Sequence, residues 1–269
     1  MKHLAIVFLL FLITCGLVSA QTPECVSLTH QALEVSGFNQ TIDEMTQLIS
    51  SEQFLQQTLG GREGAEEFME IFKPLLQKDF NGEVMRKELE SHLSTGCNPE
   101  QLTQAVQRMQ TPFVARMLAL EAATKTPEGQ AKLKRYMNIA QTAPATDERL
   151  AALDALDASS GATNFATDSS MAIMRGMMTG MEAPPDAIAQ IQEHRNEIKA
   201  QMQNTMELSF LVTYHGVTRP ELQQYAAEVG SPPLKGLYDQ IKKAFLVIME
   251  EHSKALGQDL KKSLPERRS

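Results

Sequence analysis

The sequence contains two stretches that follow one plan of helix starts and stops. Residues 96–121 and 216–241 align without a gap at an offset of 120 residues. In each stretch, a glycine that ends one helix precedes a proline-initiated helix, and a second hydroxyl–proline pair begins another. A repeat of this kind indicates that a helical unit was duplicated. The identical pairs are Gly96 and Gly216, Leu102 and Leu222, Gln104 and Gln224, and Pro112 and Pro232.

Helix signals continue through most of the remaining chain. Apolar residues recur at spacings of three and four, and no segment alternates between apolar and polar residues with a period of two. The sequence therefore predicts an all-α protein, in which two internally related multi-helix bundle halves pack together. We expect the halves at residues 21–142 and 147–257, a linker at 143–146 and a basic flexible tail at 258–269. Each half is too thin to bury its apolar stripes alone, so stacking on the other half is expected to complete the core.

Residues 1–20 have the composition of a cleaved signal peptide. A short basic start precedes an apolar run at residues 4–13, and Val18, Ser19 and Ala20 form a small-residue cleavage site. The apolar run is too short to span a bilayer as a helix. The sequence thus predicts export to the periplasm or the extracellular space, with no transmembrane segment after cleavage.

The charge of the chain bears on its partners. The formal net charge is −8, and an acidic surface repels the phosphate groups of nucleic acids. We therefore expect no nucleic-acid partner. The partners that we expect are another envelope or secreted protein, or an apolar ligand.

Two cysteines, Cys25 and Cys97, lie outside the predicted signal peptide. An even number of cysteines in an oxidising compartment favours a disulfide. No histidine or lysine flanks either cysteine to lower the pKa of its thiol. We predict a Cys25–Cys97 disulfide, and two free thiols are the alternative.

The repeated stretches also carry a family resemblance. In residues 99–112 and 220–232, a capped Pro-Glu helix start is followed, nine residues after a leucine, by Thr-Pro or Ser-Pro. This order resembles the domain of unknown function 2059 family, whose members are typically exported bacterial helical proteins. Residues 32–37 resemble the opening segment of that family. The family usually has glycine two residues after the proline, where this chain has Val114 and Leu234. The resemblance implies a compartment and a fold, present as two divergent copies, and no catalytic residues.

The most unusual composition occurs at residues 171–181, MAIMRGMMTGM. Methionine fills irregular gaps in a core, forms adaptable grooves for a partner helix, or binds Cu(I) through its soft thioether sulfur. The two glycines would let another helix approach closely. No histidine or cysteine neighbours the cluster, which argues against copper. The candidate binding surface consists of Met171, Met174, Met177, Met178, Met181, Gly176 and Gly180.

No pattern in the sequence indicates a catalytic residue, a metal site or a cofactor. The chain has no G-x-S-x-G motif, and its histidines lack the close spacing of zinc ligands. Carboxylate pairs such as Asp154 and Asp157 are typical of a solvated helix face. Our leading hypothesis is an exported, non-enzymatic helical protein that binds a protein or an apolar ligand, the latter in a cavity between the halves lined by methionine and leucine. The alternatives are methionine-based Cu(I) handling and an envelope hydrolase.

Overall fold

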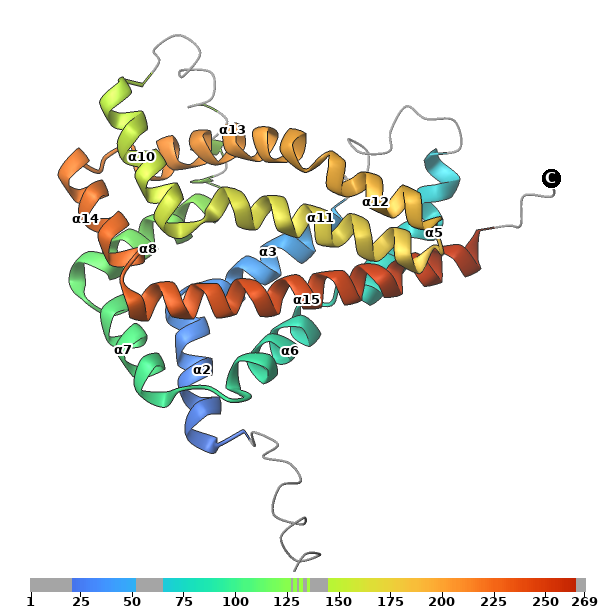
Figure 1. Ribbon diagram of the computed structural model, residues 1–269, viewed down its shortest axis with the longest axis horizontal. Helices are drawn as coiled ribbons and strands as arrows, with labels where there is room; N and C mark the ends of the chain where they lie inside the picture. The colour runs from blue at the N-terminus through green and yellow to red at the C-terminus, as the bar shows by residue number, and fades with distance from the viewer. Residues whose placement is uncertain are drawn as a thin grey trace, which may run out of the picture.

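The computed structural model describes residues 21–51, 65–126, 128–129, 131–132, 135 and 145–264. Regular structure in these residues is entirely helical, and the described ranges contain no strand, which confirms the predicted all-α class (Figure 1). The predicted signal peptide, part of the predicted linker and the end of the basic tail lie outside the described residues. No described helix is both long enough and apolar enough to cross a bilayer.

The helices follow one another in two groups along the chain. The first group contains α2 (Pro23–Val35), α3 (Phe38–Ser50), α5 (Ala65–Asp79), α6 (Gly82–Ser94), α7 (Pro99–Met109) and α8 (Pro112–Lys125). The second contains α10 (Asp147–Ser160), α11 (Ala162–Gly180), α12 (Pro185–Glu193), α13 (Arg195–Thr213), α14 (Arg219–Val229) and α15 (Pro232–Ser263).

Local chemistry sets where α7 and α14 begin. The side chain of Asn98 accepts a hydrogen bond from the backbone N–H of Gln101, which satisfies one of the unpaired donors of the first turn of α7. At the start of α14, the Glu221 carboxylate accepts from both the backbone N–H and the hydroxyl of Thr218. Both helices also have proline in their first turn.

Each of the two hydrophobic cores includes the last helix of the other group: α15 belongs to the first core and α8 to the second. The first core joins α2, α3, α5, α6 and α7 to α11 and α15, and it includes Leu89 and Ile241. The second joins α8 to α10, α13 and α14, and it includes Met117 and Leu153. Helix α15 therefore packs among helices of the first group, as its central course in Figure 1 shows, while α8 packs among helices of the second.

The longest helix contact is between α11 and α15, and it depends on glycine. A Cβ atom added to Gly176 would lie 2.7 Å from the Cβ atom of Ser253, and one added to Gly180 would lie 2.8 Å from the backbone nitrogen of Gln258. Only residues without a side chain allow backbones to come this close. The glycines of α11 are thus used to pack α11 against α15.

The start of each group of helices is tied to a later connection. The sulfur atoms of Cys25 and Cys97 lie at disulfide distance, with their Cα atoms 6.0 Å apart, so the predicted pair is confirmed. This pair joins the start of α2 to the connection between α6 and α7. In the second group, the guanidinium of Arg149 donates to the carbonyl oxygens of Tyr214 (2.6 Å) and Val217 (3.0 Å). These bonds join the start of α10 to the connection between α13 and α14.

Candidate functional site

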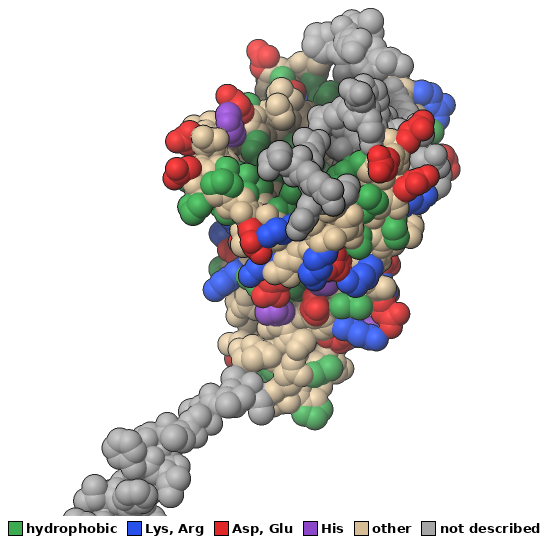
Figure 2. Space-filling view, turned by 90° about the vertical axis from the view of Figure 1, so that its right-hand side faces the viewer, with side chains coloured by type: hydrophobic (Ala, Val, Ile, Leu, Met, Phe, Trp, Pro, Cys, Tyr) green, Lys and Arg blue, Asp and Glu red, His purple; other side chains and the backbone are tan. Residues whose placement is uncertain are grey.

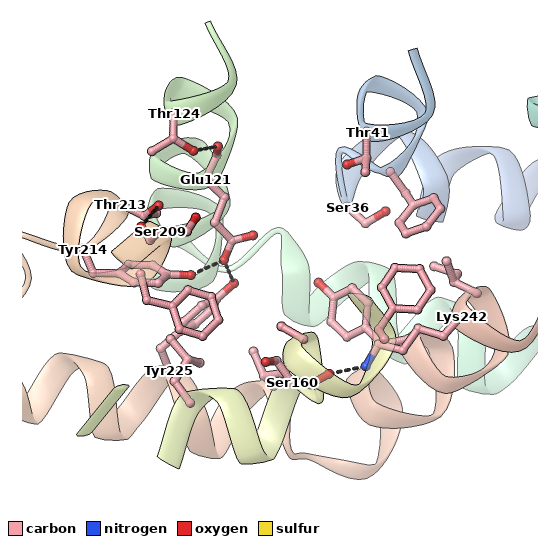
Figure 3. A pocket seen from close by; sticks show the side chains of 18 residues that line it. Ser36, Thr41, Glu121, Thr124, Ser160, Ser209, Thr213, Tyr214, Tyr225 and Lys242 are labelled. Carbon is pink, nitrogen blue, oxygen red and sulfur yellow. Dashed lines mark hydrogen bonds between the residues drawn. The ribbon is translucent and has the colours of Figure 1, made fainter. Parts of the chain in front are cut away.

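A cavity of about 290 Å³ lies where the α2–α3 turn meets α8, α10, α11, α13, α14 and α15. Its wall is mainly aromatic and hydroxyl-bearing, with one acidic and one basic side chain among the described lining residues (Figure 3). The aromatic members are Phe38, Phe165, Phe210, Tyr214, Tyr225 and Tyr238; the hydroxyl-bearing ones include Ser36, Thr41, Thr124, Ser160, Ser209 and Thr213; the charged ones are Glu121 and Lys242.

Two tyrosine hydroxyls fix the carboxylate on one side of the cavity. The hydroxyls of Tyr214 and Tyr225 donate to the same oxygen of Glu121, at 2.6 and 2.7 Å, and Figure 3 shows the three side chains converging. Each tyrosine is 2% exposed. Burial, reinforced by the negative charge of Glu121, raises the pKa of both phenols well above its usual range. The two hydroxyls therefore stay protonated at neutral pH and act as hydrogen-bond donors.

A third tyrosine extends the aromatic wall toward α15. Burial raises the pKa of Tyr238, and the charge of Glu121 adds to this effect. The rings of Tyr214 and Tyr225 lie 6.1 Å apart between centroids, and those of Phe210 and Tyr214 lie 5.8 Å apart. Aromatic pairs at these distances attract each other and keep the wall in place.

The basic side chain lies on the other side of the cavity. The ammonium group of Lys242 donates to the carbonyl oxygen of Ser160, the last residue of α10 (Figure 3). Burial lowers the pKa of Lys242; Asp239 and Asp157 oppose this shift, and Lys235 adds to it.

Two Ser-Gly turns shape this part of the cavity. Gly37 between α2 and α3 has φ 70°, and Gly161 between α10 and α11 has φ 64°. This left-handed conformation costs little only for glycine, and it ends one helix while allowing the next to begin at once. The turns bring Ser36 and Ser160 to the cavity wall.

The methionine-rich segment lies on α11 and the residue after it, and its members differ in burial. Met171 is 2% exposed, and Gly176 and Gly180 are buried against α15. The expectation that these three residues belong to an open binding surface is corrected, because the close approach that the glycines permit is already used by α15. Met174, Met177 and Met178 are partly buried, and Met181 is 38% exposed. A binding role for these four methionines, for a protein or for Cu(I), stays a prediction.

A cluster of ionisable side chains joins α15 to α6 and to the connection between α5 and α6. One ring nitrogen of His252 hydrogen-bonds to Glu88 at 2.7 Å, and the other faces the carbonyl oxygen of Asp79. Burial raises the pKa of Asp79, opposed by the positive charge of Lys78. In the described part of the chain, no group of three or more histidine, cysteine, aspartate or glutamate side chains is placed to hold a metal ion.

The face shown in Figure 2 carries acidic and basic side chains side by side. Ion pairs in the described part of the molecule include Lys261 with Glu182 and Lys87 with Glu83, at 2.5 and 2.6 Å. The described part of this face offers no broad basic surface of the kind that attracts a phosphate backbone.

One option drawn from the sequence was an apolar-ligand carrier with a cavity between the halves lined by methionine and leucine. The described lining contains Leu156 and no methionine, so the expected composition is corrected to aromatic and hydroxyl side chains. Glu121 and Lys242 were missed altogether. The one sequence signal that could have pointed to this cavity was the spacing of the tyrosines. Three of the four tyrosines in the chain, at positions 214, 225 and 238, fall within 25 residues of one another, and all three line the cavity.

Comparison of the chain with protein-family models, curated proteins and solved structures finds no match. The resemblance to the domain of unknown function 2059 family therefore stays a prediction.

Proposed function

We propose that this chain is an exported binding protein without catalytic activity, and that it holds a small, largely apolar organic molecule in the cavity. The observation that carries the proposal is the wall itself, in which six aromatic rings surround a few polar groups held in fixed positions. Small-molecule sites are typically apolar clefts with a small number of placed polar groups. The volume of about 290 Å³ is at the lower end of the range for such sites, which favours a small ligand.

The chemistry of the cavity favours binding over catalysis. The phenols of Tyr214 and Tyr225 have raised pKa values and donate to Glu121, so they are poor proton acceptors at neutral pH. An oriented carboxylate with two donors is suited to holding a ligand in one orientation. A general base would instead require a pKa near the working pH and access to the proton it removes.

We also propose that the cavity lies between two related halves produced by duplication. The turns at Ser36-Gly37 and Ser160-Gly161 have the same sequence and the same left-handed glycine, and both reach the cavity. Counted from these turns, Cys25 and Arg149 occupy equivalent positions, and each ties the first helix of its group to the corresponding later connection.

Two contacts between the groups follow the exchange of positions that a two-fold relation would require. Arg108 pairs with Glu228 at 2.7 Å, and these two residues are 120 apart and therefore equivalent to each other. Arg116 pairs with Glu221 at 2.5 Å. The positions equivalent to this pair are Gly236 and Gln101, and the Gln101 side chain lies directly against Gly236. These contacts support a ligand site at the junction of the two halves.

Binding of a neutral, environment-sensitive fluorophore such as N-phenylnaphthylamine tests the cavity. We expect saturable fluorescence enhancement with the purified chain, and we expect Ser209→Phe to abolish it, because Ser209 on α13 lines the cavity and a phenyl ring would fill it. Thr205→Phe is the matched control, since Thr205 is exposed on the same helix. Equal fluorophore binding by the two variants would contradict the proposed site.

Native mass spectrometry of the chain purified from its own cells gives a second test. A mass above that of the polypeptide, lost on extraction with organic solvent and absent from Ser209→Phe, is the expected result. Fractionation of the same cells tests export: the chain should be found outside the cytoplasm, starting at a residue near 21.

A further inference from the structure

The basic side chain of the cavity has unused hydrogen-bonding capacity. Lys242 is the one cationic residue among the described residues of the cavity wall. Its ammonium group carries three N–H donors, and one of them donates to the carbonyl oxygen of Ser160. Two donors therefore remain for a further acceptor.

The carboxylates nearest in sequence and space have other partners. One oxygen of Asp157 accepts from the backbone N–H of Thr163 at 2.9 Å, and Asp239 pairs with Lys235 at 2.5 Å. Among the described residues, no carboxylate lies within ion-pair distance of Lys242. Burial lowers the pKa of Lys242, and the negative charges of Asp239 and Asp157 only partly oppose this shift. A bound anion would supply a close counter-charge.

Most of the other described donors in the cavity are committed within the protein. The hydroxyls of Ser36, Thr41 and Ser160 donate to backbone carbonyl oxygens of their own helices or turns. The hydroxyls of Tyr214 and Tyr225 donate to Glu121. Lys242 is the one charged donor in the described wall, and it keeps N–H groups for a ligand.

The surroundings of Lys242 are suited to an apolar molecule. Ile241, the preceding residue, is fully buried, and Tyr238 lies one turn earlier on α15. Phe38 and Phe165 line the same part of the cavity, with their ring centroids 6.3 Å apart. A ligand whose charged end meets Lys242 would thus place its body against these apolar side chains.

We propose that the ligand is an apolar carboxylic acid of the fatty-acid type, with its carboxylate accepting hydrogen bonds from Lys242. This inference rests on the proposed function of the cavity. A bond between an ammonium and a carboxylate is charge-assisted and stronger than a bond between neutral groups. The same wall would hold an alcohol of equal chain length more weakly, because the alcohol brings no charge to the ammonium.

Displacement of the bound fluorophore by three molecules of equal chain length tests this class of ligand. Decanoate, decanol and decylamine are titrated below their micelle concentrations into the full chain, into Lys242→Met and into Lys243→Met. Lys243 is exposed on α15, and it controls for the loss of one positive charge. We expect the unaltered chain to bind decanoate about tenfold to a hundredfold more tightly than decanol. Lys242→Met should lose this preference and keep its affinity for decanol, whereas Lys243→Met should keep both.

The possible results separate this inference from the proposed function. Three results would each overturn the proposal of a carboxylic acid and leave the cavity as a binding site. They are equal affinity for decanoate and decanol, tightest binding of decylamine, and an unchanged preference for decanoate in Lys242→Met. Failure of all three molecules and of the fluorophore to bind a chain with native helix content would overturn both proposals.

Discussion

The glycine contact between α11 and α15 makes a prediction that can be worked out in magnitude. Gly257 on α15 is buried, and a Cβ atom added there would lie 3.1 Å from the Cα atom of Gly180 and closer still to the carbonyl oxygen of Met177. Both neighbours are backbone, so the two helices would have to move apart. Gly236 lies on the same helix, and a Cβ atom there would meet only the amide end of the Gln101 side chain, which can turn away.

In Gly257→Ala, the gain in helix propensity is opposed by the cost of overpacking, whereas in Gly236→Ala only the gain in helix propensity acts. Replacing glycine by alanine in a helix interior stabilises by about 1 kcal/mol. Overpacking a close contact costs about 1–3 kcal/mol, and a clash between two backbones belongs at the upper end of that range. We expect Gly257→Ala to lower the free energy of unfolding by about 2 kcal/mol, and Gly236→Ala to leave it unchanged or raise it by up to about 1 kcal/mol.

Urea denaturation followed by circular dichroism measures both variants against the unaltered chain. The difference in free energy should appear as a shift of the midpoint with an unchanged slope, because the surface exposed on unfolding stays the same. If Gly257→Ala were as stable as Gly236→Ala, the backbones of α11 and α15 could not be packed as closely as described. A loss of stability in Gly236→Ala equal to that in Gly257→Ala would show that the Gln101 side chain does not turn away and that the loss is not specific to the contact with α11.

Three further predictions concern stability. Cys25→Ser should lower the free energy of unfolding by about 4 kcal/mol on the chain-entropy model for a separation of 72 residues, and a reducing agent should bring the unaltered chain to the same denaturation midpoint without affecting the variant. Hydrogen bonds from Thr218 lower the pKa of Glu221 to about 2, so the stability advantage over Glu221→Gln should be present above pH 4.5 and disappear as the pH falls toward 2 in a series of denaturation curves. Burial raises the pKa of Asp79, so the unaltered chain should lose stability as the pH rises through that pKa while Asp79→Asn does not, and a constant difference between the two chains from acid to neutral pH would refute this.

Helix boundaries could be predicted because their causes are local. The bond from Asn98 to the backbone of α7 and the bonds between Thr218 and Glu221 each span three residues, so the sequence alone displays them. The disulfide could be predicted for a different reason, since only two cysteines were available outside the predicted signal peptide.

The burial of Gly176 and Gly180 against α15 could not be predicted, because periodicity does not identify the neighbour. Spacing places Gly176 and Gly180 on one strip of a helix, and the same strip serves equally for a partner protein or for another helix of the chain. The structure places α15 there, and α15 lies more than 50 residues later.

The lining of the cavity was beyond sequence reasoning for the same physical reason. The bond between Tyr214 and Glu121 joins residues 93 apart, and the bond between Lys242 and Ser160 joins residues 82 apart. None of these four residues belongs to a recognisable sequence motif, because the residues that line a cavity need only come together in the folded chain. The clustering of tyrosines was visible in the sequence, but it does not reveal which carboxylate they would hold.

The contacts that hold the starts of α2 and α10 in place bear on the proposed export. At positions that the proposed duplication makes equivalent, the first group of helices uses the Cys25–Cys97 pair and the second uses two hydrogen bonds from Arg149. Hydrogen bonds of a charged donor to backbone carbonyls form in any compartment, whereas a disulfide persists only where the surroundings are oxidising. We therefore expect the first group of helices to reach its full stability only outside a reducing cytoplasm, while the contacts of Arg149 carry no such requirement. Because α15 packs among helices of the first group, and because α8 and α15 both contribute to the cavity wall, loosening the first group would also disturb the proposed binding site. We therefore expect ligand affinity, and not stability alone, to depend on the oxidation state of the two cysteines.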